Sequence, residues 1–264
     1  MRPALAGTAL AAALGAFGCP AAAVDFNAAD LYVYIPSFTA PELETGDRSL
    51  ITGAGGRTRW SHALEAEWAP SRYWKTEFYD VLSQSAPRPL VEQSVEWENI
   101  FPVAKGPHLD AGFLVRGDLP SHGCGPGTGG IMPIISSKLG VETLTLNFPF
   151  EGQSGPGAFQ GTRSDYAARE ITWINPYAAP AFEAFGWPGP VGRWPALADQ
   201  THLGGPAIYG IVPLDRGRLL RYSASCLFGL TRAFGGRLAV FRLEYRYWHG
   251  RTPHVSESES APIF

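Results

Sequence analysis

The sequence predicts an all-β fold, an antiparallel transmembrane β-barrel of about 12 strands (with 10 to 14 as the range) that follows a cleaved signal peptide. Three observations lead to this fold class. Gly 31 and Pro 23 make up about a fifth of the 264 residues, which leaves little room for long helices. Apolar residues reach 45% and aromatic residues 12%, whereas charged residues are only 17%. Several segments alternate between apolar and charged side chains, which is the period of a strand.

The first 23 residues have the pattern of a secretory signal peptide. Arg2 supplies the positive charge, residues 4–17 are apolar or small, and a run of alanines ends at Ala23. The apolar run is shorter than the roughly 20 residues that a membrane-spanning helix needs. Lipid attachment at Cys19 stays open as the alternative to cleavage after Ala23. Residues 24–248 are expected to form the barrel.

The clearest strand lies at residues 58–68. Trp60, Leu64 and Trp68 share one face of it, and Glu65 and Glu67 share the other. At ~3.3 Å per residue the two tryptophans lie ~26 Å apart along the strand. A tilt of ~40° brings this to ~20 Å along a membrane normal, close to the ~25 Å apolar band between the aromatic girdles of outer-membrane barrels.

The same alternation recurs at 90–100, 217–229 and 236–248. The twelve expected strands are 31–36, 58–68, 74–83, 90–100, 108–117, 130–138, 141–150, 164–174, 180–186, 204–213, 217–229 and 236–248. The long outer loops are expected at 40–57, 119–129, 152–163 and 187–200, and short connections at the opposite, periplasmic end. Closure would place the first strand beside the last. Residues 249–264, rich in serine and glutamate, are expected to be a polar, disordered tail.

A resemblance to a known family is carried by seven segments: His62–Trp68, Tyr73–Glu77, Glu96–Asn99, His202–Gly210, Gly217–Tyr222, Leu227–Thr231 and Phe241–Tyr245. They resemble an uncharacterised family of proteobacterial outer-membrane β-barrels that is similar to the phenol-degradation meta-pathway transporter-like barrels. The resemblance implies a barrel in the outer membrane. It brings no established substrate.

The alternation defines the candidate functional residues. The side chains expected to line the lumen are Glu65, Glu67, Glu92, Glu96, Glu98, Arg221, Arg242, Glu244 and Arg246. The aromatic side chains expected at the membrane girdles are Trp60, Trp68, Trp97, Tyr222, Phe228, Tyr245 and Tyr247. Charges of both signs suit either a channel that selects solutes by charge and diameter, or an interior filled by Arg–Glu pairs. Both interpretations stay open.

Other functions find less support in the sequence. A net charge of -3 offers no footprint for nucleic acid. Residues 125–130 match Gly-x-Gly-x-x-Gly but contain Pro126 and lead into no helix, so no nucleotide cofactor is expected. The loop residues Ser121, His122 and Cys124 could bind a metal or hydrolyse lipid only with partners from elsewhere, and no catalytic or metal site is expected. His62 and Ser61 are adjacent on one strand and face opposite sides.

The sequence therefore predicts a non-enzymatic barrel of the bacterial outer membrane without a cofactor. It is either a passive channel for small solutes or a structural barrel with an ion-paired lumen. The expected partners are outer-membrane lipid and small-molecule solutes. The alternatives are a soluble β-rich binding protein of the periplasm and an outer-membrane lipid-modifying hydrolase. Whether Cys124 and Cys226 form a disulfide is left open.

Overall fold

The computed structural model describes residues 31–36, 38, 42–54, 57–85, 89–121, 126–214 and 218–247. The expected signal peptide, residues 1–23, and the expected tail, residues 249–264, lie outside this part. The described chain has thirteen strands and one short 3₁₀ turn, Leu197–Asp199. The strands are β1 (Glu42–Ala54), β2 (Arg57–Ser71), β3 (Trp74–Ser85), β4 (Val91–Lys105), β5 (Leu109–Pro120), β6 (Gly127–Leu139), β7 (Glu142–Asn147), β8 (Phe150–Ser154), β9 (Thr162–Thr172), β10 (Ala179–Pro190), β11 (Thr201–Pro213), β12 (Leu219–Gly229) and β13 (Arg237–Tyr247).

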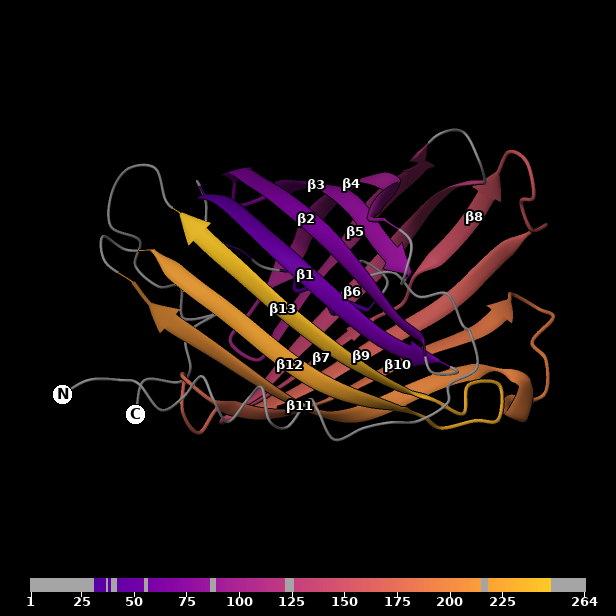
Figure 1. Cartoon of the computed structure of the whole chain (residues 1–264). Coiled ribbons are helices and arrows are strands. Elements are labelled where there is room, and N and C mark those ends of the chain that lie inside the picture. The colour runs from indigo at the N-terminus through magenta and orange to yellow at the C-terminus, as the bar shows by residue number, and fades with distance from the viewer. Residues whose placement is uncertain are drawn as a thin grey trace.

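The strands form one closed antiparallel barrel (Figure 1). Successive strands pair with each other, and β13 pairs with β1 from Leu43 opposite Tyr247 to Thr52 opposite Leu238. Both β7 and β8 lie between β6 and β9, so they are two halves of one barrel strand. The break falls at Phe148 and Pro149, because proline has no backbone N–H for the ladder. The wall therefore has twelve strands, as predicted.

Eleven of the expected strands overlap strands of the structure, and the first one is wrong. Residues 31–36 form no strand, and β1 lies instead within the expected outer loop 40–57. The alternation of β1 is difficult to see because Asp47 and Ser49 stand among the outward positions and Gly46 and Leu50 among the inward ones. Both faces of β1 therefore mix polar and apolar residues.

The faces of the wall differ sharply in polarity. On β2, Trp68 is 51% exposed on the outer face, whereas Glu67 beside it is 3% exposed on the inner face. The same pattern of outward apolar and inward charged side chains holds along β4, β12 and β13. This sidedness agrees with a wall that faces lipid and an interior that holds the charges.

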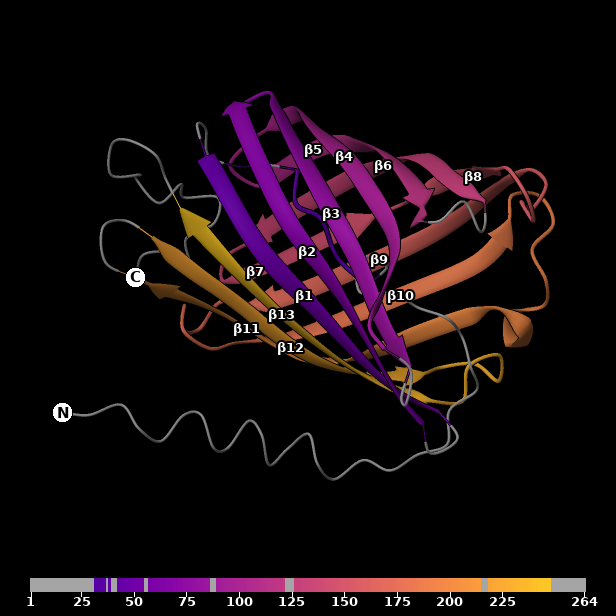
Figure 2. The same ribbon diagram turned by 45° about the horizontal axis from the view of Figure 1, so that its top comes forward.

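The two ends of the barrel differ in the length of their connections. We call the end at which β1 begins and β13 ends the terminus end, and the opposite end the loop end (Figure 2). Connections at the terminus end have two to six residues, and those at the loop end have two to ten. The tight β6–β7 turn uses Gly140 at φ 62°, which glycine adopts without strain. The expected long loops 119–129, 152–163 and 187–200 overlap connections of the loop end.

No helix in the described ranges is long and apolar enough to cross a membrane.

Candidate functional site

The interior of the barrel holds a segment of the chain itself. Leu31, Val33, Tyr34 and Phe38 lie in the lumen and are buried. We call residues 31–36 with Phe38 the lumen segment. Its apolar side chains account for the strand-like pattern of the sequence, since they pack against inward-facing residues of the wall. The pattern that predicted a strand of the wall belongs to a segment that the wall surrounds.

The wall holds the lumen segment by its peptide groups. Asn147 Oδ1 accepts a hydrogen bond from the Tyr34 N–H at 2.7 Å, and Asn147 Nδ2 donates to the Tyr34 carbonyl oxygen at 3.0 Å. From the opposite side of the barrel, Arg242 Nη2 donates to the Leu31 carbonyl oxygen at 2.5 Å. Three hydrogen bonds to buried groups therefore fix the position of the segment.

Apolar side chains surround the two ends of the lumen segment. Toward the loop end, Leu31 and Val33 belong to a buried cluster whose other members are Leu50, Ala63, Tyr79, Val81, Ala167, Phe185, Leu203, Leu227, Phe234, Leu238 and Val240. Tyr34 and Phe38 belong to a second cluster with Ala69, Ile100, Leu114, Met132 and Ile134. The lumen is thus packed with side chains over much of its length.

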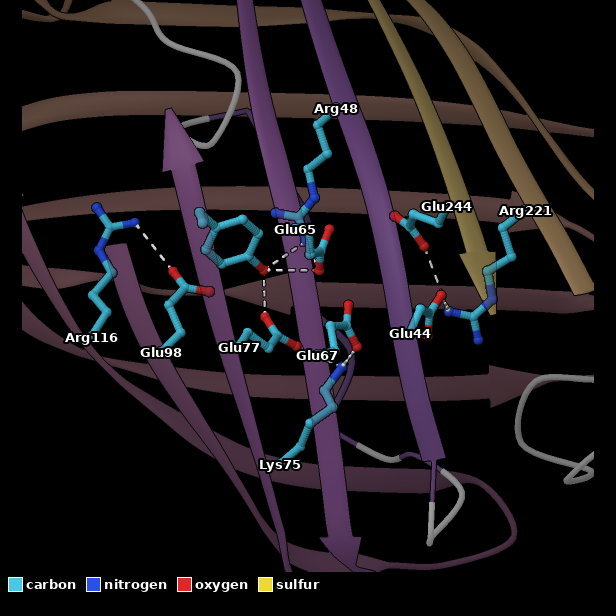
Figure 3. Close-up of polar contacts among 11 residues, drawn as sticks. Glu44, Arg48, Glu65, Glu67, Lys75, Glu77, Glu98, Arg116, Arg221 and Glu244 are labelled. Atoms are coloured by element: carbon cyan, nitrogen blue, oxygen red, sulfur yellow. Dashed lines mark hydrogen bonds and ion pairs between the residues drawn. The ribbon is translucent and has the colours of Figure 1, made fainter. Parts of the chain in front are cut away.

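Ion pairs occupy the middle of the lumen. Arg48 is 1% exposed, and its Nη2 lies 2.8 Å from both Glu65 Oε1 and the Tyr79 hydroxyl (Figure 3). The guanidinium also lies 3.5 Å from the centre of the Tyr32 ring, a cation–π contact. Arg48 therefore joins the lumen segment to β2 and β3.

Three carboxylates meet beside Arg48. Glu65, Glu67 and Glu77 place carboxylate oxygens within 4.8 Å of one another, and Figure 3 shows them turned toward each other. Lys75 Nζ lies 2.7 Å from Glu67 and 2.6 Å from Glu77. The lysine already supplies a cation to this acidic cluster.

Further pairs continue around the wall. Arg242 lies 3.0 Å from Glu183, whose carboxylate also accepts a hydrogen bond from the Tyr209 hydroxyl. Other inward pairs in the described part are Arg116 with Glu98 (3.9 Å) and Glu151, Arg163 with Glu151 (2.9 Å) and Asp165 (3.0 Å), Arg221 with Glu44 (3.5 Å) and Glu244 (3.6 Å), and Lys138 with Asp110 (3.3 Å). Buried charges need such partners, because desolvation of an unpaired one is costly.

Most residues expected to line the lumen lie inside the barrel. Buried on the inner face are Glu65, Glu67, Glu96, Glu98, Arg242 and Glu244, and Arg221 is partly buried there. Glu92 does not lie with them: it is exposed and accepts a hydrogen bond from Ser121 Oγ at 2.6 Å. The register of β3 with β4 shifts by one residue at Gln93, and such a bulge moves the residues beyond it to the other face. The Arg246 side chain lies outside the described part.

Several polar residues that complete this interior are not among those predicted from the sequence: Arg48, Lys75, Glu77, Tyr79, Arg116, Asn147, Glu151 and Glu183. Lys75, Glu77 and Tyr79 alternate with Trp74, Thr76 and Phe78, so the same rule would have found them. Arg48 was hidden by the expected loop. Nothing in the sequence marks Asn147 as a ligand of distant backbone groups.

The aromatic side chains predicted to form the girdles lie on the outer face of the wall, as far as the structure describes them. Trp60, Trp68 and Trp97 are exposed, and Tyr222, Phe228 and Tyr245 are partly exposed. The Trp97 indole N–H donates to Thr76 Oγ1 at 2.8 Å, so its polar group is satisfied on an otherwise apolar surface. The Tyr247 side chain lies outside the described part. That these residues contact lipid stays a prediction.

Two carboxylates, Asp47 and Asp80, also face outward, in line with Leu64 on the strand between them. His62 Nδ1 lies 3.3 Å from Asp47 Oδ1 and 3.0 Å from Ser49 Oγ. A serine hydrolase needs the acid and the hydroxyl on opposite nitrogens of the imidazole, whereas here both contact Nδ1. We therefore interpret the group as a polar cluster on the outer face. Cys226, on β12, is a free thiol, and Cys124 lies outside the described part.

A cavity of about 390 Å³ remains in the lumen toward the terminus end. Tyr32, Ile35 and Pro36 of the lumen segment form one side of it. The wall contributes apolar residues, among them Ile171 and Trp173, and several cationic ones. This volume lies in the range of small-molecule pockets.

Comparisons with known proteins support the fold. No family model and no curated protein matches the chain. Among solved structures, the NanC porin matches with a TM-score of 0.54 and 7% identity over 78% of this chain and 100% of the porin. A double variant of OccD1 (OprD) matches with a TM-score of 0.38 and 11% identity over 79% of this chain and 66% of its own. At these identities the first match shows the fold alone: the chain has the closed β-barrel architecture of the NanC porin.

Proposed function

We propose that this protein is a β-barrel of the bacterial outer membrane that passes small solutes when the lumen segment leaves the lumen. In this proposal the outer face contacts outer-membrane lipid permanently, and small-molecule solutes bind only while they pass through the lumen. No chemical step and no cofactor are assigned to it. We also propose that the protein is a member of the family of barrels similar to the phenol-degradation meta-pathway transporters, which its sequence resembles.

The outer face supports a membrane location. Large apolar side chains such as Leu64, Phe78, Val95, Ile131 and Phe182 stand exposed on β2, β3, β4, β6 and β10. A belt of this kind is expected where lipid covers it, whereas water-exposed proteins rarely leave large contiguous apolar patches. A freely dissolved periplasmic binding protein would have to leave this belt in water, so the belt favours the membrane.

The main support for a channel is that the lumen is obstructed by the lumen segment, which is not part of the wall. The lumen is filled in part by a segment that is held by three hydrogen bonds and by apolar packing, and that forms no strand of the wall. Moving it would leave the ladders of the barrel intact. Burial of each large apolar side chain such as Leu31 or Val33 is worth about 1.5–3 kcal/mol, so the obstructed form should dominate at rest.

Single-channel recording in planar bilayers tests the proposal. We would compare the natural chain with a variant in which residues 31–36 are replaced by glycine and serine. The matched control replaces the exposed residues 191–196 of the loop end in the same way. The natural chain and the control should show rare, short openings, and the 31–36 variant frequent and long ones.

Two results would count against the channel. Silence of all three proteins would leave a structural barrel with an ion-paired interior. Equal conductance in all three would mean that the lumen segment obstructs nothing. Heat-modifiable mobility on gels, together with extraction by detergent only, would test the membrane location independently of conduction.

A further inference from the structure

The cavity at the terminus end combines an apolar body with cationic side chains. Ile171, Trp173 and Ile35 provide apolar surface, and Lys138, Arg169, Arg221 and Arg242 also line it. Three of these cations are paired: Lys138 with Asp110, Arg221 with Glu44 and Glu244, and Arg242 with Glu183. The fourth, Arg169, differs from them.

Arg169 has no carboxylate oxygen within 4.0 Å among the residues that the structure describes. The register of β9 with β10 places Glu183 directly beside it, but the Glu183 carboxylate is engaged by Arg242 and Tyr209. The Arg169 guanidinium lies 5.0 Å from the centre of the Tyr209 ring, and its Nε has no hydrogen-bond acceptor, which is also true of the Arg242 Nε. Arg169 and Arg242 therefore have one carboxylate, that of Glu183, between them, whereas Lys138 and Arg221 each have carboxylates of their own.

We propose that Arg169 anchors a binding site for a small carboxylate with an apolar or aromatic body. The planar guanidinium matches a carboxylate with two parallel hydrogen bonds. The apolar part of the ligand would lie against Ile171 and Trp173, with Tyr32 of the lumen segment closing the other side. This inference rests on the proposed function and names the substrate class of the same lumen.

The position of the site relates it to the lumen segment. Tyr32 and Ile35 line the cavity, so a bound carboxylate would touch the segment that obstructs the lumen. The cavity of about 390 Å³ is large enough for a single-ring acid. A site of this kind would hold the solute before it passes.

Calorimetric titration of the full chain in detergent micelles tests the site. The probes are benzoate and its neutral analogue benzamide, which has nearly the same shape. The variants are Arg169→Gln, which removes the charge, and Arg169→Lys, which keeps it without the planar fork. Arg193→Gln, at an exposed arginine of the loop end, is the control.

We expect saturable benzoate binding that is about 10- to 100-fold tighter than benzamide binding, the range of a charge-assisted hydrogen bond. Arg169→Gln should lose the same factor, Arg169→Lys part of it, and Arg193→Gln none. Equal affinity for both probes, an unaltered Arg169→Gln, or no saturable benzoate binding by the natural chain would each overturn the assignment. The comparison of probes needs no variant, so a misfolded Arg169→Gln would leave the test intact.

Failure of this site and failure of the channel are distinguishable. Binding in micelles requires neither an open lumen nor a bilayer. A chain that conducts potassium chloride but does not bind benzoate would keep the channel and refute the site, and a silent chain that binds benzoate would do the reverse.

Discussion

Replacement of Arg48 by methionine would show whether the lumen interior is dry. Methionine keeps most of the volume of the side chain but removes its charge and its donors. Arg48 is 1% exposed and its partner Glu65 is 5% exposed. In such a buried environment, loss of Arg48 leaves the Glu65 carboxylate charged and desolvated without its cation.

The expected magnitude follows from this burial. Removing one member of a buried ion pair costs about 3–5 kcal/mol, because the remaining charge stays desolvated. In a water-filled lumen the same pair would contribute only about 0–1 kcal/mol. The lost cation–π contact with Tyr32 adds about 0.5–2 kcal/mol. We therefore expect Arg48→Met to lower the free energy of unfolding by at least about 3 kcal/mol.

Urea unfolding in phospholipid vesicles, followed by tryptophan fluorescence, measures this loss. Arg232→Met is the control, since Arg232 pairs with Asp199 at 2.8 Å but its side chain is 74% exposed, and a change below about 1 kcal/mol is expected there. The double variant Arg48→Met with Glu65→Gln should recover part of the loss, because it removes the stranded carboxylate. If Arg48→Met costs no more than Arg232→Met, the interior is solvated and the argument from buried pairs is wrong.

Four further predictions concern the lumen segment and the outer face. Asn147→Ala should cost about 2 kcal/mol of segment binding through two lost hydrogen bonds, and should expose Tyr34 to limited proteolysis in micelles; unchanged cleavage would contradict this. Burial raises the pKa of Tyr32 and of Tyr34 well above the usual range, so both hydroxyls stay protonated while the lumen segment lies in the lumen. The lumen segment should therefore be held less stably as the pH rises past about 10, and channel openings should become more frequent above that pH. An opening frequency that does not change with pH would refute this prediction. Asp80→Leu should stabilise the barrel in vesicles by about 1 kcal/mol, since the carboxylate faces outward among apolar side chains; destabilisation would place it in water. Cys226 should react with a lipid-soluble maleimide and resist a charged one, as judged by mass spectrometry; the opposite order would argue against a lipid-facing β12.

The wall of the barrel was predictable because each side chain on a strand has only two directions available. Once Trp60 and Trp68 were assigned to the outer face, Glu65 and Glu67 had to point inward, and the structure places them there. The rule failed at Glu92, because a bulge changes the parity of a strand without leaving a mark in the composition. It failed again at β1, where both faces are mixed.

The lumen segment was beyond this kind of reasoning. Residues 31–36 carry apolar side chains at strand-like spacing, and nothing local distinguishes a strand of the wall from a segment inside it. The difference lies in contacts more than 100 positions apart, such as Tyr34 with Asn147 and Leu31 with Arg242. The sharing of Glu183 between Arg169 and Arg242 is of the same kind, since it depends on which cation engages the carboxylate directly.

The hydrogen bonds from Asn147 and Arg242 to the main chain of the lumen segment have a consequence for how this protein can evolve. Every residue has a backbone carbonyl group, and every residue except proline has a backbone N–H. These three hydrogen bonds therefore do not depend on which side chains the lumen segment carries. Mutations in the lumen segment can change by small steps how tightly the segment is bound, while its position in the lumen stays the same. Selection could thus tune how readily the barrel opens without redesigning the wall.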